Sequence, residues 1–194
     1  MVEKFQFSAL LSRKDLEALA QIKNQKFRFL GGVDVCNLWA ICAIEISSSN
    51  SFLEITSDYI LPLASNGDLG DFEVAKFEVG VSPLANAEKR MKQGWVFLQG
   101  SGQVIKEVFV ARTLSKENSE TLEADQAIIL QLDKCVLVMK FDWSGNFLFV
   151  VEFFKTISAF EKAFLQVLER HLEGTSEISM KLHKASELVE ETNV

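Results

Sequence analysis

The sequence predicts an α+β fold, in which an antiparallel β-sheet packs against a short N-terminal helix and against C-terminal helices. Between about residues 27 and 155, apolar residues repeatedly alternate with polar ones, which is typical of strands with one buried face. After residue 157 the apolar spacing changes to that of an amphipathic helix. We therefore expect a single domain over residues 1–194, with a C-terminal helical region at about 157–191. Whether the sheet curves strongly, into a partial barrel, stays open.

The composition is that of a globular protein. Of 194 residues, 48% are hydrophobic and 24% are charged, which excludes wholesale disorder. The chain contains sixteen phenylalanines and one tyrosine, so we expect most aromatic rings to lie in the core. The net charge is −7, from 27 acidic and 20 basic residues. A negative chain repels a phosphate backbone, so we expect no nucleic-acid binding.

Further patterns bear on the location of the protein. No apolar stretch of about 18 residues occurs, so we expect no membrane span. The first residues lack the basic and apolar regions of a secretory signal. The three cysteines, Cys36, Cys42 and Cys135, form no Cys-x-x-Cys pair, and an odd number fits a reducing compartment. We therefore expect a cytoplasmic protein with neither a metal nor a cofactor.

The first predicted element is a short helix that begins after Ser12. A hydroxyl at this position and an acid three residues later, Asp15, form a capping-box pattern. The apolar face of the helix is expected to contain Leu16, Leu19 and Ala20. The helix is expected to end near residue 24. Residues 27–30 follow this helix, and the pair Gly31–Gly32 after them indicates a turn.

The middle of the chain predicts strands. Residues 35–46 have an apolar residue at every even position from 36, so we expect a strand there, with a buried helix as the alternative for the first half. Two short strands are predicted at 52–56 and 59–63, and Pro62 places the second at a sheet edge. Within 72–81 the apolar parity switches, which indicates a bulge or a bend near Ala75.

The second half predicts more strands and then helices. Strands are expected at 95–98, 104–112, 128–132, 135–141 and 147–154. The polar segment 113–126 is expected to be an exposed loop, and 142–146 a hairpin loop. Ser158 and Glu161 resemble a capping box at the start of a helix whose apolar stripe includes Phe160 and Phe164. Gly174 is expected to end it, and a second helix to begin at Ser176.

Two loops contain the candidate binding residues. Trp143 stands beside Asp142 in the predicted hairpin loop, and an exposed tryptophan is a frequent anchor at protein interfaces. The alternative is a tryptophan that folds back over the sheet. Asp68 and Asp71 stand in a glycine-containing loop that would suit partner recognition. Their spacing does not match a calcium-binding EF-hand loop, and a solvated turn is the plainer interpretation.

Three classes of function remain. We expect a non-enzymatic protein–protein interaction module, of the immunity or antitoxin type, because its acidic charge would steer it to a basic partner. The alternative is a carrier of a small apolar ligand, with a cavity between a curved sheet and the C-terminal helix. The third class is an enzyme with a site assembled from distant residues and His171 as a base. A histidine at the edge of the core is the plainer interpretation of His171. The sequence does not indicate the oligomeric state.

Overall fold

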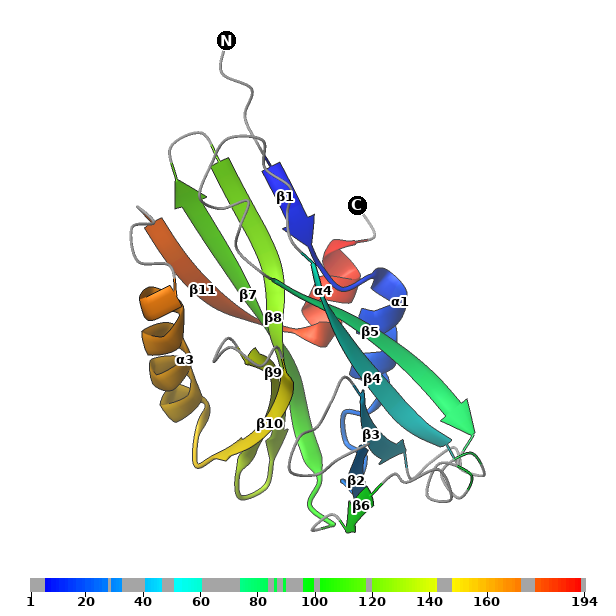
Figure 1. The fold of residues 1–194 in the computed structure, drawn as a ribbon. Coiled ribbons are helices and arrows are strands. Elements are labelled where there is room, and N and C mark those ends of the chain that lie inside the picture. Colours follow the sequence, from blue (N-terminus) through cyan, green and yellow to red (C-terminus); the bar gives the residue numbers. More distant parts are fainter. Residues whose placement is uncertain are drawn as a thin grey trace.

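The computed structural model of the chain describes residues 6–27, 29–32, 41–46, 51–60, 74–83, 86, 89, 96–99, 102–117, 120–142, 148–171 and 177–192. These residues form two β-sheets and three helices (Figure 1). The broad α+β prediction is therefore confirmed. Within the described part of the chain neither sheet closes or curls strongly, so the structure has two open sheets instead of one strongly curved sheet.

The larger sheet has the strand order β10-β9-β8-β7-β11, with β1 paired to β8. Its strands are β1 (Gln6–Ala9), β7 (Ile105–Glu117), β8 (Glu120–Leu132), β9 (Val136–Asp142), β10 (Leu148–Phe154) and β11 (Glu177–Lys184). All pairs are antiparallel except β1 with β8, which is parallel. One edge of β8 is shared: β1 pairs with residues 121–124 and β9 with residues 127–131.

The smaller sheet has the order β5-β4-β3-β2-β6 and is antiparallel throughout. Its strands are β2 (Phe29–Gly32), β3 (Ile41–Ile46), β4 (Ser51–Ile60), β5 (Val74–Pro83) and β6 (Val96–Gln99). The helices are α1 (Arg13–Gln21), α3 (Ile157–His171) and α4 (Ala185–Glu191).

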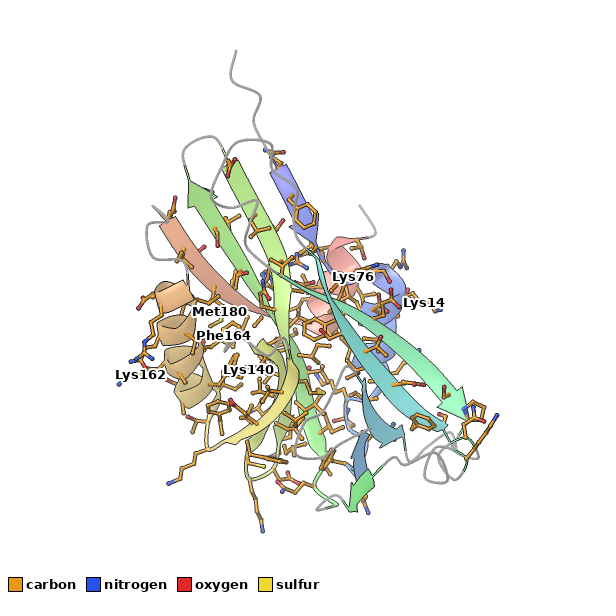
Figure 2. The ribbon with its side chains drawn as sticks, viewed as in Figure 1. Lys14, Lys76, Lys140, Lys162, Phe164 and Met180 are labelled. Carbon is orange, nitrogen blue, oxygen red and sulfur yellow. The ribbon has the colours of Figure 1, made fainter. Side chains whose placement is uncertain are left out.

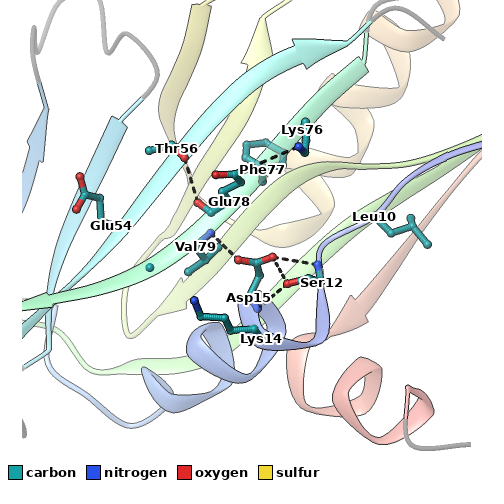
Figure 3. A pocket seen from close by; sticks show the side chains of 11 residues that line it. Leu10, Ser12, Lys14, Asp15, Glu54, Thr56, Lys76, Phe77, Glu78 and Val79 are labelled. Atoms are coloured by element: carbon teal, nitrogen blue, oxygen red, sulfur yellow. Dashed lines mark hydrogen bonds and ion pairs between the residues drawn. The ribbon is translucent and has the colours of Figure 1, made fainter. Parts of the chain in front are cut away.

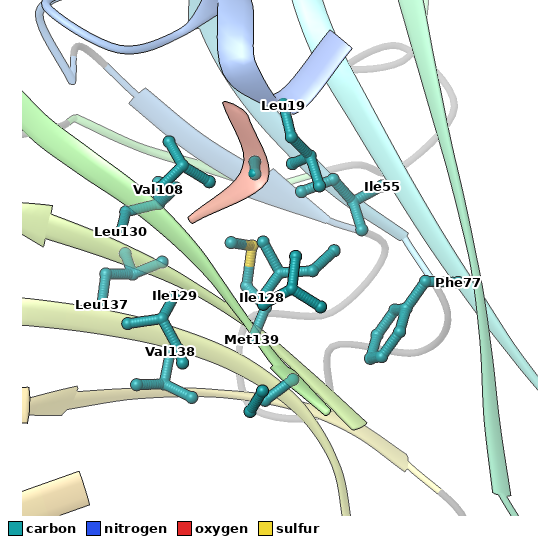
Figure 4. Packing of buried hydrophobic residues seen from close by; sticks show 14 of the residues in the cluster. Leu19, Ile55, Phe77, Val108, Ile128, Ile129, Leu130, Leu137, Val138 and Met139 are labelled. Carbon is teal, nitrogen blue, oxygen red and sulfur yellow. The ribbon is translucent and has the colours of Figure 1, made fainter. Parts of the chain in front are cut away.

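The larger sheet lies between two layers. Helix α3 covers one side of it, and α1, α4 and the smaller sheet lie on the other side (Figure 1). One hydrophobic cluster joins these layers, and Phe164 of α3 is one of its buried members. Figure 4 shows others, among them Leu19, Ile55 and Ile128. In Figure 2, Phe164 lies between α3 and the strands, near Met180 of β11. The layers are held together chiefly by burial of apolar surface.

Helix α1 begins where the sequence predicts. Ser12 is the N-cap, its hydroxyl accepts a hydrogen bond from the Asp15 amide (3.3 Å), and the Asp15 carboxylate accepts one from the Ser12 amide (3.0 Å). This is the predicted capping box. Leu16 and Leu19 are fully buried on the apolar face, as expected. The helix ends at Gln21, and Asn24 adopts a positive φ of 65° in the turn that follows.

The long hairpin of β7 and β8 contradicts the prediction of an exposed loop over 113–126. Strand β7 continues to Glu117, and β8 begins at Glu120. Thr113 and Ser115 are buried, since they pair with Ala124 and Leu122, two members of a second hydrophobic cluster that also contains Val74. The Thr113 hydroxyl donates to the Ala124 carbonyl (3.3 Å). Polar residues that find hydrogen-bond partners can be buried in a sheet, so polarity alone did not identify a loop here.

The segment after Ser176 also differs from the prediction of a second helix. Residues 177–184 form β11, and the last helix, α4, begins only at Ala185. Ile178, Met180 and Leu182 alternate with more polar residues, which is the period of a strand. Their partly buried side chains pack on the main core.

Three predictions in the first half of the chain are also wrong. Gly31 and Gly32 belong to strand β2 instead of a turn, because both pair with neighbouring strands. Residues 51–60 form one strand, β4, instead of two separate ones. β5 pairs with β4 without a register shift, so no bulge occurs at Ala75. The parity switch has another cause: Val74 and Phe77 pack into two different hydrophobic clusters.

The other strong patterns are confirmed. Strands β6, β9 and β10 lie close to the predicted ranges, and Leu148 pairs with Asp142 as the predicted hairpin requires. β3 confirms the second half of the strand predicted at 35–46, and residues 35–40 lie outside the described residues. Helix α3 buries Phe160 and Phe164. The amide of Ala159 donates to the Thr156 hydroxyl (3.1 Å), so α3 is capped two residues before the predicted Ser158. Pro62 and Gly174 lie outside the described residues.

Truncation of Phe164 tests the core. Its side chain is 1% exposed, and its ring lies 5.1 Å from that of Phe160. We expect Phe164→Ala to lower the free energy of unfolding by about 3–5 kcal/mol, because it removes buried apolar surface and leaves a cavity. Urea unfolding followed by circular dichroism measures this change. Val81→Ala is the matched control, because Val81 is 53% exposed. Equal losses for the two variants would contradict the packing.

Candidate functional site

A groove of about 500 Å³ lies between the start of α1 and the adjacent edge of the smaller sheet (Figure 3). It is lined by Leu10, Ser12, Lys14, Asp15, Glu54, Thr56, Lys76, Phe77, Glu78, Val79 and Gly80. Residues 10–15 come from the connection after β1 and the first turn of α1, and the others come from β4 and β5. Its volume lies within the range of small-ligand sites.

The Asp15 carboxylate joins the two walls of the groove. Its Oδ1 atom accepts a hydrogen bond from the Val79 amide of β5 (2.7 Å). Its Oδ2 atom accepts bonds from the amide and from the hydroxyl of Ser12. One oxygen therefore holds α1 against the edge of β5, and the other caps the start of the helix. Asp15 has a structural role here, and its capping role was the part that the sequence predicted.

The floor of the groove is open at Gly80. In the register of β4 and β5, Glu54 pairs with Gly80, and Thr56 pairs with Glu78. Because side chains alternate along each strand, these residues share one face of the sheet. A Cβ atom added at Gly80 would meet no heavy atom within 4 Å. The sheet face thus has a vacant position between the carboxylates of Glu54 and Glu78.

The charges in the groove are mixed but slightly acidic. The lining contains the acids Asp15, Glu54 and Glu78 and the bases Lys14 and Lys76. Glu54 accepts a hydrogen bond from the Ser82 hydroxyl (3.1 Å), and Lys76 lies 3.5 Å from Glu78. Both members of the Lys76–Glu78 pair are more than half exposed, so this pair contributes little to stability. The groove can accept hydrogen bonds and positive charge from a ligand.

A buried ion pair supports the other side of the groove. Asp125 of β8 is 1% exposed, and Arg112 of β7 donates to both of its oxygens, from Nε to Oδ1 (2.8 Å) and from Nη2 to Oδ2 (3.2 Å). The Leu11 amide also donates to Oδ2 (2.8 Å). Asp125 thereby fixes the connection between β1 and α1 to the larger sheet.

The ion pair lies at an irregularity of the sheet. Ala111 pairs with Ala127 but Arg112 pairs with Asp125, so Gln126 is an extra residue on β8. Such a β-bulge brings neighbouring side chains of the bulged strand toward the same partner. Burial by itself lowers the pKa of Arg112, but the hydrogen bond from Arg112 to Asp125 and the nearby acids raise this pKa above its usual value.

His183 of β11 lies close to this ion pair. Partial burial, and then the positive charges of Arg112 and Lys181, lower the pKa of His183 below its ordinary value, while Glu191 and Asp125 oppose this shift. The neutral imidazole is therefore the form that the folded protein stabilises.

The residues that the sequence singled out are not part of this groove as described. Trp143, Asp68 and Asp71 lie outside the described residues, so their binding roles stay predictions. Asp142 ends β9 and His171 ends α3, and only their backbone positions are described. No sequence pattern marks Glu54, Glu78 or Gly80 as site residues, because only strand pairing brings them together.

Among the described residues, no group of three histidine, cysteine, aspartate or glutamate side chains is placed to hold a metal ion. In the same part of the chain, no helix is both long and apolar enough to cross a membrane. Comparison with known proteins found no matching family model, no similar curated protein and no similar solved structure.

Loss of the Asp125 charge tests the buried ion pair. We expect Asp125→Asn to lower the free energy of unfolding by about 3–5 kcal/mol, because it leaves the guanidinium of Arg112 without its counter-ion. Arg112 is only 17% exposed. Chemical denaturation at neutral pH measures the change. Glu17→Gln is the control, since Glu17 pairs with Arg13 on the exposed surface of α1. A loss below about 1 kcal/mol for Asp125→Asn would contradict the structural role of this pair.

The lowered pKa of His183 predicts a dependence of stability on pH. Below its ordinary value of 6.5 the unfolded chain binds a proton that the folded protein binds less readily. The free energy of unfolding should therefore fall as the pH decreases through 6.5, and His183→Gln should reduce this slope. The pKa values of Asp133 and Glu187 are also lowered, from ordinary values of 3.8 and 4.5. These two carboxylates therefore change the free energy of unfolding only near and below those pH values, outside the range of His183. An unchanged slope between pH 7 and 5.5 in His183→Gln would refute the assignment.

Proposed function

We propose that this protein is a non-enzymatic binding module, and that its groove receives a basic, extended segment of a protein partner. The observation that carries the proposal is the vacant position over Gly80 between Glu54 and Glu78. A lysine or arginine side chain of a partner would fill this position and would approach both carboxylates. Charge-assisted hydrogen bonds of this kind are stronger than neutral ones.

The rim of the groove suits a protein segment. Leu10 is 38% exposed at the rim and offers an apolar contact beside the charged floor. Lys14, Lys76 and Glu78 are also exposed, so a segment can enter from solvent. The net charge of −7 would steer a basic partner toward the protein. Immunity and antitoxin proteins act as binders of this general kind, and such a role in the cytoplasm stays a prediction.

The carrier of a small apolar ligand is less well supported. Phe77 is the one aromatic residue in the lining of the groove, and charged or hydroxyl-bearing residues make up much of the rest. Phe160 and Phe164 are buried in the main core instead of lining this groove. A ligand that lacks polar groups would displace water from the charged floor of the groove without replacing the hydrogen bonds that this water makes, at a cost in free energy.

A substitution at the floor of the groove tests the proposal. Gly80→Arg should fold, because nothing obstructs a side chain there, and its guanidinium should occupy the position proposed for the partner. We expect it to weaken binding of a basic peptide at least about tenfold, which corresponds to about 1.4 kcal/mol. The probe is a hexapeptide containing arginine and leucine, and the readout is the change in amide NMR shifts at Asp15, Val79 and Gly80.

Two controls make this experiment decisive. Gly80→Ala adds a small neutral group and should bind the peptide nearly as the unaltered protein does. A peptide with glutamate in place of arginine should cause no comparable shifts. Binding that is equal for both peptides, or that survives Gly80→Arg, would overturn the proposal. With the natural partner, high salt should release the complex, and Gly80→Arg should prevent its capture.

A further inference from the structure

Among the described strands, β10 lies at one end of the larger sheet. All seven of its residues pair with β9, and no described strand pairs with its other side. Phe153 on this strand is 59% exposed, which is more than Leu10 or Val81, the other exposed large hydrophobic residues described. A strand edge offers unpaired amides and carbonyls to another strand, and an exposed phenylalanine adds apolar surface to that edge.

Other described edges carry the features that usually prevent such pairing. At β5, the Asp15 carboxylate binds the outward amide of Val79, so α1 covers the edge. Along β11, the exposed side chains include the charged Glu177 and Lys181. β1 is only four residues long. Short strands, charged side chains and covering helices are the known protections of sheet edges. The described part of β10 has neither a covering helix along its edge nor a lysine or proline.

The charge of β10 also permits another chain to approach. Two copies with a net charge of −7 repel one another, so contact is least costly at a neutral surface. Glu152 is the one acid among residues 148–154, and it forms an ion pair with Lys140 of β9 (3.2 Å). Lys140 is mostly buried, so its charge is committed to this pair. The edge is therefore neutral and apolar.

We propose that two copies of this chain associate by antiparallel pairing of their β10 strands, which joins the two six-stranded sheets into one continuous sheet. The strand is complementary to itself about Val151. In that register Val151 lies opposite its own copy, Val150 lies opposite Glu152, and Phe153 lies opposite Phe149. Glu152 therefore never faces a second Glu152, and the two partners offer equivalent hydrogen-bonding groups. An interface with two-fold symmetry is the commonest way for identical chains to associate.

The size of this contact sets its expected strength. A ladder of seven residues buries less than the roughly 1,200 Å² of a stable interface, so the dimer should form reversibly and depend on concentration. Its formation does not involve the groove, which lies at β5 on the other sheet. Self-association and partner binding can therefore be tested independently.

Sedimentation velocity of the full chain tests the proposal between about 5 and about 500 µM, a range that includes weak dimers. We expect the average mass to rise from 21.8 kDa toward twice that value. Phe153→Lys should weaken association at least about tenfold, because it places a charge at the neutral edge. Val81→Lys is the matched control: Val81 is 53% exposed on a strand whose edge α1 covers, so association should persist.

A second measurement does not depend on a variant. Hydrogen exchange of the unaltered protein should slow at amides of residues 148–154 as the concentration rises, while exchange in β5 should not change. A single 21.8 kDa species at the highest concentration would overturn the proposal. Equal weakening by Phe153→Lys and Val81→Lys, or slowed exchange elsewhere without a change in β10, would also overturn it, because association would then use another surface.

Discussion

The arrangement of this protein depends on the carboxylate of Asp125. It lies on the central strand β8, at the point where the neighbouring strand changes from β1 to β9. Neither neighbour supplies a strand partner there, and a buried acid without partners would be costly. Arg112 and the Leu11 amide satisfy it from two different elements. The bulge at Gln126 lets the ladder continue past this point. One ion pair thus fixes how the N-terminal segment meets the larger sheet.

The position of the groove follows from that contact. With Leu11 held by Asp125, Ser12 and Asp15 begin α1 beside β5, and Asp15 in turn binds the Val79 amide. The walls of the groove are therefore connected to the buried core by a short series of hydrogen bonds. The floor at Gly80 is open because glycine has no side chain at that register position. A rigid wall facing an open floor suits a binding site, since little ordering is needed when a ligand binds.

The edges of the two sheets differ in how far they are covered. Asp15 closes the edge of β5 with the same carboxylate that caps α1, so one side chain both begins a helix and blocks a strand edge. In the part of the chain that the structure describes, no comparable group binds the edge of β10, and Phe153 is exposed along this strand. Because unprotected edges favour pairing between chains, this contrast is the basis for proposing different partners at β5 and at β10.

The elements that could be predicted from the sequence are those specified by residues close together in the chain. The Ser12–Asp15 capping box, the hairpin around residues 142–148 and the apolar stripe of α3 are set by neighbours within a few residues. Long-range contacts, in contrast, set the division into two sheets, the burial of Thr113 and Ser115 within the hairpin of β7 and β8, and the pairing of residues 177–184 with β7. The same holds for Asp125 and for Glu54, Glu78 and Gly80. Their roles depend on partners many residues away, and a polar residue can be buried wherever such a partner satisfies it.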